Sequence, residues 1–118
     1  MVLLNFVIGI SGGVDSAVTS TLCAQTGLKV VCVQMPIYQS ECQVNRGKEH
    51  INQLMQRFPN VSEAESNLTT VFESFKKVLP SDTEEHQLHL TLANTRARVR
   101  MTTLYYYGGI YSLLVAGT

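Results

Sequence analysis

Apolar positions along the chain form short continuous runs that alternate with stripes at helical spacing. Residues 2–10 and 28–35 are nearly continuous in apolar and β-branched residues, which is typical of strands covered on both faces. Between these runs, apolar and small residues recur at helical spacing until Gly27, a residue that favours a helix end; they are Val14, Ala17, Val18, Thr21 and Leu22. The pattern predicts two buried strands joined by an amphipathic helix.

Three further helical stripes follow a polar loop at residues 37–43. They end at Phe58-Pro59, at Pro80 and at Gly108-Gly109, positions that disfavour helix continuation. Their apolar residues are Val44, Ile51, Leu54, Met55 and Phe58, then Leu68, Val71, Phe72, Phe75 and Leu79, then Leu90, Ala93, Ala97, Met101, Leu104 and Tyr105. Residues 61–66 resemble a short strand interrupted by two glutamates, and residues 113–116 a last strand. This alternation predicts an α/β fold with a parallel sheet and helices on both faces.

Length and composition narrow the class of protein. A chain of 118 residues has the length of a single domain, and 45% apolar residues are too many for a disordered tail. Nine basic residues balance nine acidic ones, which argues against a dedicated nucleic-acid binder. The first apolar run covers about half a membrane span, so we expect no membrane segment and no signal peptide. Three cysteines at unrelated spacings indicate reduced thiols in a cytoplasmic protein.

The two ends of the chain lack the polar flanks that usually border a domain. Met1 leads directly into the first apolar run, and Thr118 follows the last one. We therefore expect residues 1–118 to form a single domain truncated at its C-terminus and also at its N-terminus. The parallel sheet is then expected to be incomplete.

The string Ser11-Gly12-Gly13-Val14-Asp15-Ser16 lies between the first strand and the first helix. Its glycines allow backbone amides to close around phosphate oxygens, and a helix N-terminus adds the positive end of its dipole. It is not a Walker A loop, because it lacks Gly-Lys-Ser/Thr, and it lacks the spacing of the dinucleotide fingerprint. A carboxylate beside phosphates suits Mg²⁺. The alternative is a plain strand-to-helix turn, but the complete string favours phosphate binding.

This loop resembles the pyrophosphate loop of the N-type ATP pyrophosphatases, which cleave ATP between its α- and β-phosphates and adenylate a substrate. A second segment, 92–101, contains Ala97-Arg98-Val99-Arg100-Met101 and leads through three tyrosines to Leu113–Thr118. That segment is similar to the Ala-Arg-x-Arg-Met helix and following strand of the NAD synthetase family. The resemblance implies a Rossmann-like fold of the adenine nucleotide alpha hydrolase-like type, and an ammonia-dependent enzyme of that family, a ligase forming a C–N bond.

The resemblance also implies specific roles. The reaction is expected to convert deamido-NAD, ATP and ammonia to NAD, AMP and pyrophosphate, with Mg²⁺ held by Asp15 and no catalytic side chain. Arg98 is expected to contact deamido-NAD, and the family resemblance implies a homodimer. The expected ATP-binding residues are Gly9, Ile10, Ser11, Gly12, Gly13, Val14, Asp15, Ser16, Met35 and Thr118. The family's second, glutamate ligand of Mg²⁺ would follow Thr118, so we expect residues 1–118 alone to be inactive.

Two other functions remain open from the residues alone. One is another adenylating enzyme with the same loop, such as a GMP synthetase-like module. The other is a non-catalytic module that binds ATP or AMP. Purely structural roles also remain open for other side chains. A solvated or ion-paired basic face is open for Arg96, Arg98 and Arg100, and core packing with exposed hydroxyls is open for Tyr105, Tyr106 and Tyr107. Surface or capping roles are open for His50, His86 and His89.

Overall fold

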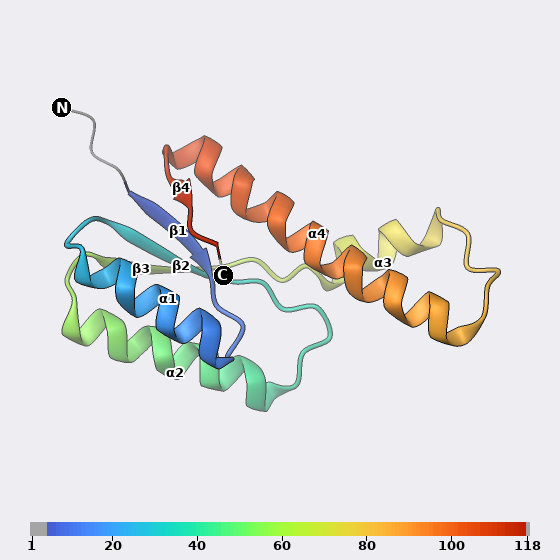
Figure 1. Ribbon diagram of the computed structural model, residues 1–118, viewed down its shortest axis with the longest axis horizontal. Helices are drawn as coiled ribbons and strands as arrows, with labels where there is room; N and C mark the ends of the chain where they lie inside the picture. Colours follow the sequence, from blue (N-terminus) through green and yellow to red (C-terminus); the bar gives the residue numbers. More distant parts are fainter. Residues whose placement is uncertain (1–4, 118) are drawn as a thin grey trace.

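The computed structural model describes residues 5–117, and these residues form a four-stranded parallel sheet in the order β3-β2-β1-β4. The strands are β1 (Phe6–Gly9), β2 (Val30–Gln34), β3 (Val61–Glu65) and β4 (Leu114–Val115). The connecting helices are α1 (Val14–Gln25), α2 (Glu41–Arg57), α3 (Thr69–Lys77) and α4 (Glu85–Tyr111). The chain adds β2 and then β3 on one side of β1, and later adds β4 on the other side. A topological switch point therefore lies between β1 and β4 (Figure 1).

Helices cover both faces of the sheet, as the strand pattern predicts. Alternate residues of each strand point to opposite faces. In β1, Val7 joins a buried cluster on the α4 side that includes Phe72 and Leu104. Its neighbour Ile8 joins the cluster on the α1 and α2 side with Ile51. The burial of all of β2 and of the middle of β1 follows from this alternation, because each strand supplies side chains to both clusters. The edge segment 61–65, with its two glutamates, is also a strand and pairs with β2.

The buried face of α1 is not the apolar stripe. Val14, Val18 and Leu22 are more than half exposed, whereas the buried residues of α1 are Ser16, Ser20 and Ala24. The expectation that a helical apolar stripe marks the packed face is wrong for this helix. Hydrogen bonds made by Ser16 within the loop and by Ser20 toward α2 set its rotation instead.

Two predicted helix boundaries are also wrong. Helix α2 begins at Glu41 inside the expected polar loop, because the Ser40 hydroxyl accepts a hydrogen bond from the backbone N–H of Gln43 at 3.3 Å. Helix α4 does not stop at Gly108-Gly109 but continues to Tyr111, and Ser112 adopts the left-handed conformation that ends it (φ 55°). Gly108 instead leaves room for the backbone oxygen of Leu113, which would lie 2.8 Å from a Cβ at this position.

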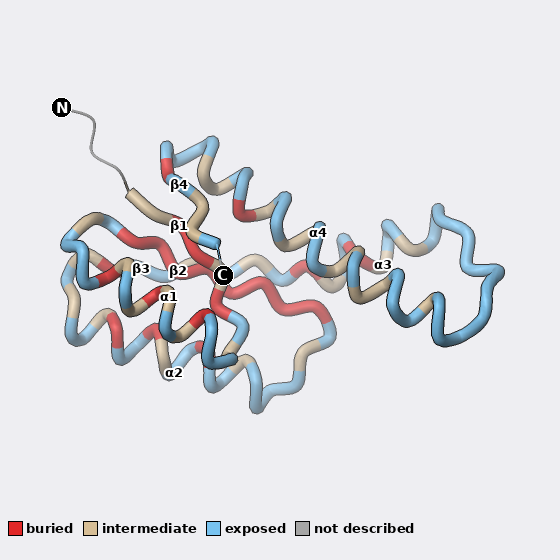
Figure 2. Tube along the Cα trace, in the orientation of Figure 1, coloured by how far each residue is buried: buried red, intermediate tan, exposed pale blue. Residues whose placement is uncertain are grey.

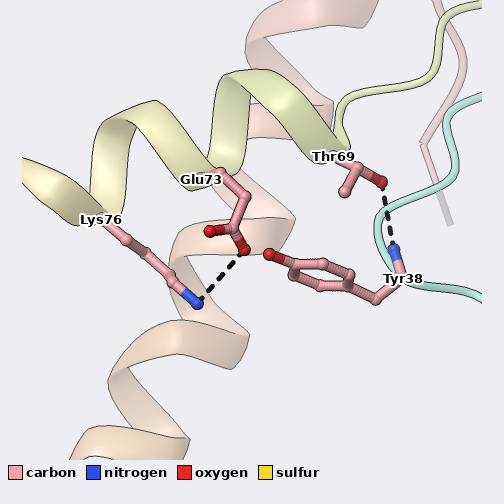
Figure 3. Close-up of polar contacts among 4 residues, drawn as sticks. All are labelled: Tyr38, Thr69, Glu73 and Lys76. Atoms are coloured by element: carbon pink, nitrogen blue, oxygen red, sulfur yellow. Dashed lines mark hydrogen bonds and ion pairs between the residues drawn. The ribbon is translucent and has the colours of Figure 1, made fainter.

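The α3 helix and the first half of α4 form an arm that extends beyond the sheet, and the molecule measures 51 × 33 × 20 Å. Figure 2 shows that most of this arm is exposed. It is tied to the loop after β2, where the backbone N–H of Tyr38 donates to the Thr69 hydroxyl at 3.3 Å. Lys76 and Glu73 form an ion pair on α3 at 3.6 Å beside the same tyrosine (Figure 3). Among residues 5–117, every helix is too short or too polar to span a bilayer.

Candidate functional site

A pocket of about 350 Å³ lies between the loop that follows β1 and the middle of α4. It is at the carboxyl end of β1, beside the switch point, which is where open parallel sheets ordinarily bind ligands. The loop after β2 closes a third side through Met35 and Gln39. The residues that line the pocket are Gly9, Ile10, Ser11, Asp15, Ser16, Met35, Gln39, Ala97, Arg100, Met101 and Leu104.

Two serine hydroxyls hold the loop in shape. The buried Ser16 hydroxyl lies 3.2 Å from both the backbone nitrogen and the hydroxyl of Ser11, and 3.3 Å from the Gly13 carbonyl. The Ser11 hydroxyl in turn accepts a hydrogen bond from the Gly13 N–H at 3.2 Å. These bonds bring the start of α1 against the end of β1. The first amides of α1, which no helical carbonyl can satisfy, then face this region.

The two loop glycines serve different purposes. Gly12 has a φ of +87°, and a Cβ at this position would lie 2.8 Å from the backbone oxygen of Gln43 on α2. Side chains are therefore excluded at Gly12 by conformation and by space. Gly13 has a φ of −94°, and a Cβ there would meet only the Ser11 hydroxyl, at 3.4 Å. The backbone conformation at position 13 does not require glycine, and the space that a side chain would occupy there is open to a ligand.

Most of the residues predicted to bind ATP line this pocket, but not all of them. Gly12 and Gly13 line a separate small cavity of about 30 Å³ between the loop and α2. Val14 is 77% exposed and lines neither cavity. Thr118 lies outside the described residues. Asp15, the predicted Mg²⁺ ligand, is exposed at the pocket mouth, and residues 5–117 contain no group of three or more candidate metal ligands.

Arg98 lies in a different place from the phosphate loop. It is exposed and lines a second pocket of about 560 Å³ between α3 and α4. This pocket combines the apolar side chains of Val71 and Phe75 with polar groups from Asn94 and Thr95. The structure thus separates two residues that the sequence singled out, Asp15 and Arg98, into two neighbouring pockets on either side of α4.

Arg100, which sequence reasoning did not assign to the site, reaches the loop pocket instead. Its Nε donates to the backbone oxygen of Met35 at 3.0 Å, which anchors α4 to the end of β2. Burial, and secondarily the charge of Arg96, lowers the pKa of the Arg100 guanidinium. The spacing of Arg96 and Arg100 placed them on one face of a helix, but only the tertiary contact shows which one enters the pocket. Within residues 5–117 none of the three arginines forms an ion pair, so the ion-paired alternative for this basic face is not observed there.

His50 connects α2 to the helix that begins at the loop. Its Nε2 lies 2.8 Å from the Ser20 hydroxyl, and burial lowers the pKa of the imidazole. A surface role is therefore wrong for His50, whereas His86 and His89 are exposed as expected. The signal that was missed is the small polar Ser20 on α1, four residues after Ser16, where a large apolar residue would ordinarily pack.

Comparisons with known proteins give a consistent result. A sequence model of the family described as NAD synthase matches residues 3–118. The chain is 35% identical over 115 residues to an NH(3)-dependent NAD(+) synthetase of Pyrobaculum aerophilum and 40% identical over 114 residues to one of Mesoplasma florum. Both alignments cover 95% of this chain, but only 40% and 44% of the relatives. The chain therefore spans less than half the length of the curated relatives it matches.

A solved structure supports the same fold. The structure of an NMN synthetase from Francisella tularensis superposes with a TM-score of 0.83 at 31% sequence identity. That match covers 97% of this chain and 44% of the other. The fold is therefore Rossmann-like, and it corresponds to less than half of the Francisella tularensis chain.

Proposed function

Because the chain belongs to the NAD synthase family, we propose that it forms the nucleotide-binding part of an ammonia-dependent NAD synthetase. In this reaction the carboxylate of deamido-NAD attacks the α-phosphorus of ATP and releases pyrophosphate. Ammonia then attacks the resulting acyl-adenylate, which yields NAD and AMP. No side chain of the protein needs to form a covalent bond, so the protein contributes by positioning and by neutralising charge.

The observation that carries this proposal is the serine-braced loop at the carboxyl end of β1. Its hydroxyls and the start of α1 border a pocket closed on the other side by α4. ATP phosphates would lie against Ser11 and Ser16, and the adenosine would lie toward Met35 at the end of β2. Donors already held in place by the fold need little reorganisation when charge develops on phosphate oxygens.

Asp15 is the residue proposed to hold Mg²⁺, together with oxygens of the bound phosphates. Its exposed carboxylate at the pocket mouth fits this, because Mg²⁺ at nucleotide sites commonly uses one or two carboxylates, phosphates and water. When bound, the ion would neutralise charge on the phosphates. Loss of the Asp15 charge should therefore weaken the reaction more than the fold.

The second pocket is proposed to bind part of deamido-NAD. Arg98 supplies a cation there, Phe75 supplies an aromatic face, and Asn94 and Thr95 supply polar groups. These groups suit a ligand that carries phosphates and aromatic rings. The loop pocket and this pocket both border α4, which would let one helix orient both reactants.

We also propose that the full protein is a homodimer. The arm and α4 expose large apolar side chains, including Phe75, Tyr105, Tyr106 and Ile110. Tyr107, in contrast, is half-buried and its hydroxyl lies 2.7 Å from that of Ser66. The tyrosine run thus divides between internal packing and surface, and the exposed members suit contact with a second copy.

A chimera tests the proposed reaction. Residues 5–117 would replace the matched part of the Mesoplasma florum relative, and NAD formation from deamido-NAD, ATP, Mg²⁺ and ammonia would be followed by chromatography. We expect NAD and AMP in equal amounts, and a loss of turnover of at least 100-fold in the Asp15→Asn chimera. A folded chimera that binds ATP without forming NAD would instead favour a non-catalytic ATP-binding module. Residues 1–118 alone are expected to form no NAD.

NMN is a second candidate product. The support for it is the structural match to an NMN synthetase at a TM-score of 0.83. The same chimera would be incubated with the carboxylic-acid form of NMN in place of deamido-NAD. A rate higher than with deamido-NAD would assign the smaller substrate, whereas turnover of neither would favour another ATP pyrophosphatase.

A further inference from the structure

Arg100 lines the loop pocket and has no ion-pair partner within residues 5–117. Its side chain is half-buried and lines the loop pocket opposite Ser11, Asp15 and Ser16. Within residues 5–117 the single ion pair is Lys76–Glu73 on α3, so no described carboxylate lies within 4.0 Å of this guanidinium. A partly desolvated cation without a carboxylate is costly to keep unless a ligand supplies the negative charge.

The backbone contact of Arg100 also orients it. Its Nε–H donates to the Met35 oxygen at 3.0 Å. A guanidinium has five N–H donors in a planar fork, so this bond leaves the four terminal N–H groups for a ligand. Of the described residues that line this pocket, Arg100 alone carries a positive charge and Asp15 alone carries a negative charge.

We propose that Arg100 is the side chain that binds the phosphate chain of the nucleotide in this pocket, across from the serine loop. This inference rests on the proposed ATP-dependent function. It assigns Arg96 a structural role instead, because that guanidinium lies over the ring of Phe72 at 5.8 Å from the centroid. Arg98 faces the second pocket, so the three arginines of this helix have three different surroundings.

The test compares ATP with ligands that carry only part of its chemistry. Binding of ATP, inorganic tripolyphosphate and adenosine to the purified 118-residue chain would be measured by calorimetry, for the wild type, Arg100→Gln and Arg100→Lys. A charged hydrogen-bond pair lost from a partly buried site lowers affinity about 10- to 100-fold. We expect that loss for ATP and tripolyphosphate in Arg100→Gln, a smaller loss in Arg100→Lys, and unchanged adenosine binding.

A matched control removes the same charge elsewhere. Arg57→Gln changes an exposed arginine at the last turn of α2, which lies over Phe58 at the opposite end of the sheet from the loop. Its ATP affinity should equal that of the wild type. Circular dichroism would establish that each variant is folded. If Arg100→Gln does not fold, Arg100→Lys still tests the assignment.

Three results would overturn the assignment in different ways. Equal ATP affinity in the wild type and both Arg100 variants would show that Arg100 does not touch the nucleotide. An equal loss for adenosine and ATP would place Arg100 at the base, not at the phosphates. Absence of ATP binding by the wild type would instead count against the proposed nucleotide site itself, and with it this inference.

Discussion

The imidazole Nε2 of His50 lies 2.8 Å from the buried hydroxyl of Ser20, and this contact joins α2 to the helix that starts at the serine loop. The Ser20 hydroxyl has one hydrogen, for which the Ser16 carbonyl at 2.7 Å, the Ala17 carbonyl at 3.1 Å and the His50 Nε2 are the available acceptors. Where that hydrogen goes to a carbonyl, the Nε2–H tautomer of His50 donates to the hydroxyl. A half-buried histidine of α2 thus supports α1, the helix that starts at the serine loop.

This histidine should make stability fall in mild acid. Burial lowers the pKa of His50 in the native state, whereas the unfolded chain titrates near 6.5. Below about that pH the unfolded state binds a proton that the native state resists, so the free energy of unfolding falls as pH falls until the native pKa is passed. Urea unfolding at several pH values between 5 and 8 measures this. His50→Gln, which retains an N–H donor, should show a shallower decline, and an identical decline would contradict the assignment.

Substitutions at the two loop glycines should have different effects, one on ligand binding and the other on stability. Gly13→Val places a side chain on the open side of the loop, where only Ser11 is near, so ATP binding should be lost while stability falls by less than about 1 kcal/mol. Gly12→Val forces a positive φ and a contact with the Gln43 backbone, which should cost about 1–3 kcal/mol. Calorimetric titration and urea unfolding check both. Unchanged ATP binding in Gly13→Val would remove the phosphate role of the loop.

The glycine pair near the end of α4 offers a second matched comparison. A Cβ on Gly108 would lie 2.8 Å from the backbone oxygen of Leu113, because the chain folds back there and the Leu113 N–H donates to the Gly108 oxygen at 2.9 Å. Gly108→Ala should therefore destabilise the protein by about 1–3 kcal/mol. Gly109 has nothing within 4 Å, so Gly109→Ala should stabilise it by about 0.5–1 kcal/mol through helix propensity. Equal effects in urea unfolding would mean that the turn does not need Gly108.

The three cysteines should differ in reactivity. Burial, with a smaller effect from Cys23, raises the pKa of Cys32 to about 12, and burial raises that of Cys23. Cys42 is exposed at the start of α2. Iodoacetamide at pH 8, followed by peptide mass spectrometry, should therefore modify Cys42 first and Cys32 only after unfolding. A Cys42→Ser variant should lose the rapid phase, and rapid modification of Cys32 would contradict its burial.

The sequence alone determined the fold class, the positions of the strands and the position of the serine and glycine loop. Continuous apolar runs such as Val30–Val33 have few alternatives to a strand buried on both faces. The six-residue serine and glycine string is local, because its hydrogen bonds join residues no more than five apart. Local pattern and local geometry coincide at these places, so they could be read without the tertiary structure.

Tertiary structure decided the rotation of helices and the placement of side chains across them. The rotation of α1, which leaves Val14 and Val18 exposed, depends on a contact between Ser20 and a distant residue, His50. The difference between Arg98 and Arg100 arises in the same way, because their directions around α4 acquire meaning only once β2 and α3 lie against it. Spacing places two arginines on different faces of a helix, but only packing specifies what each face meets.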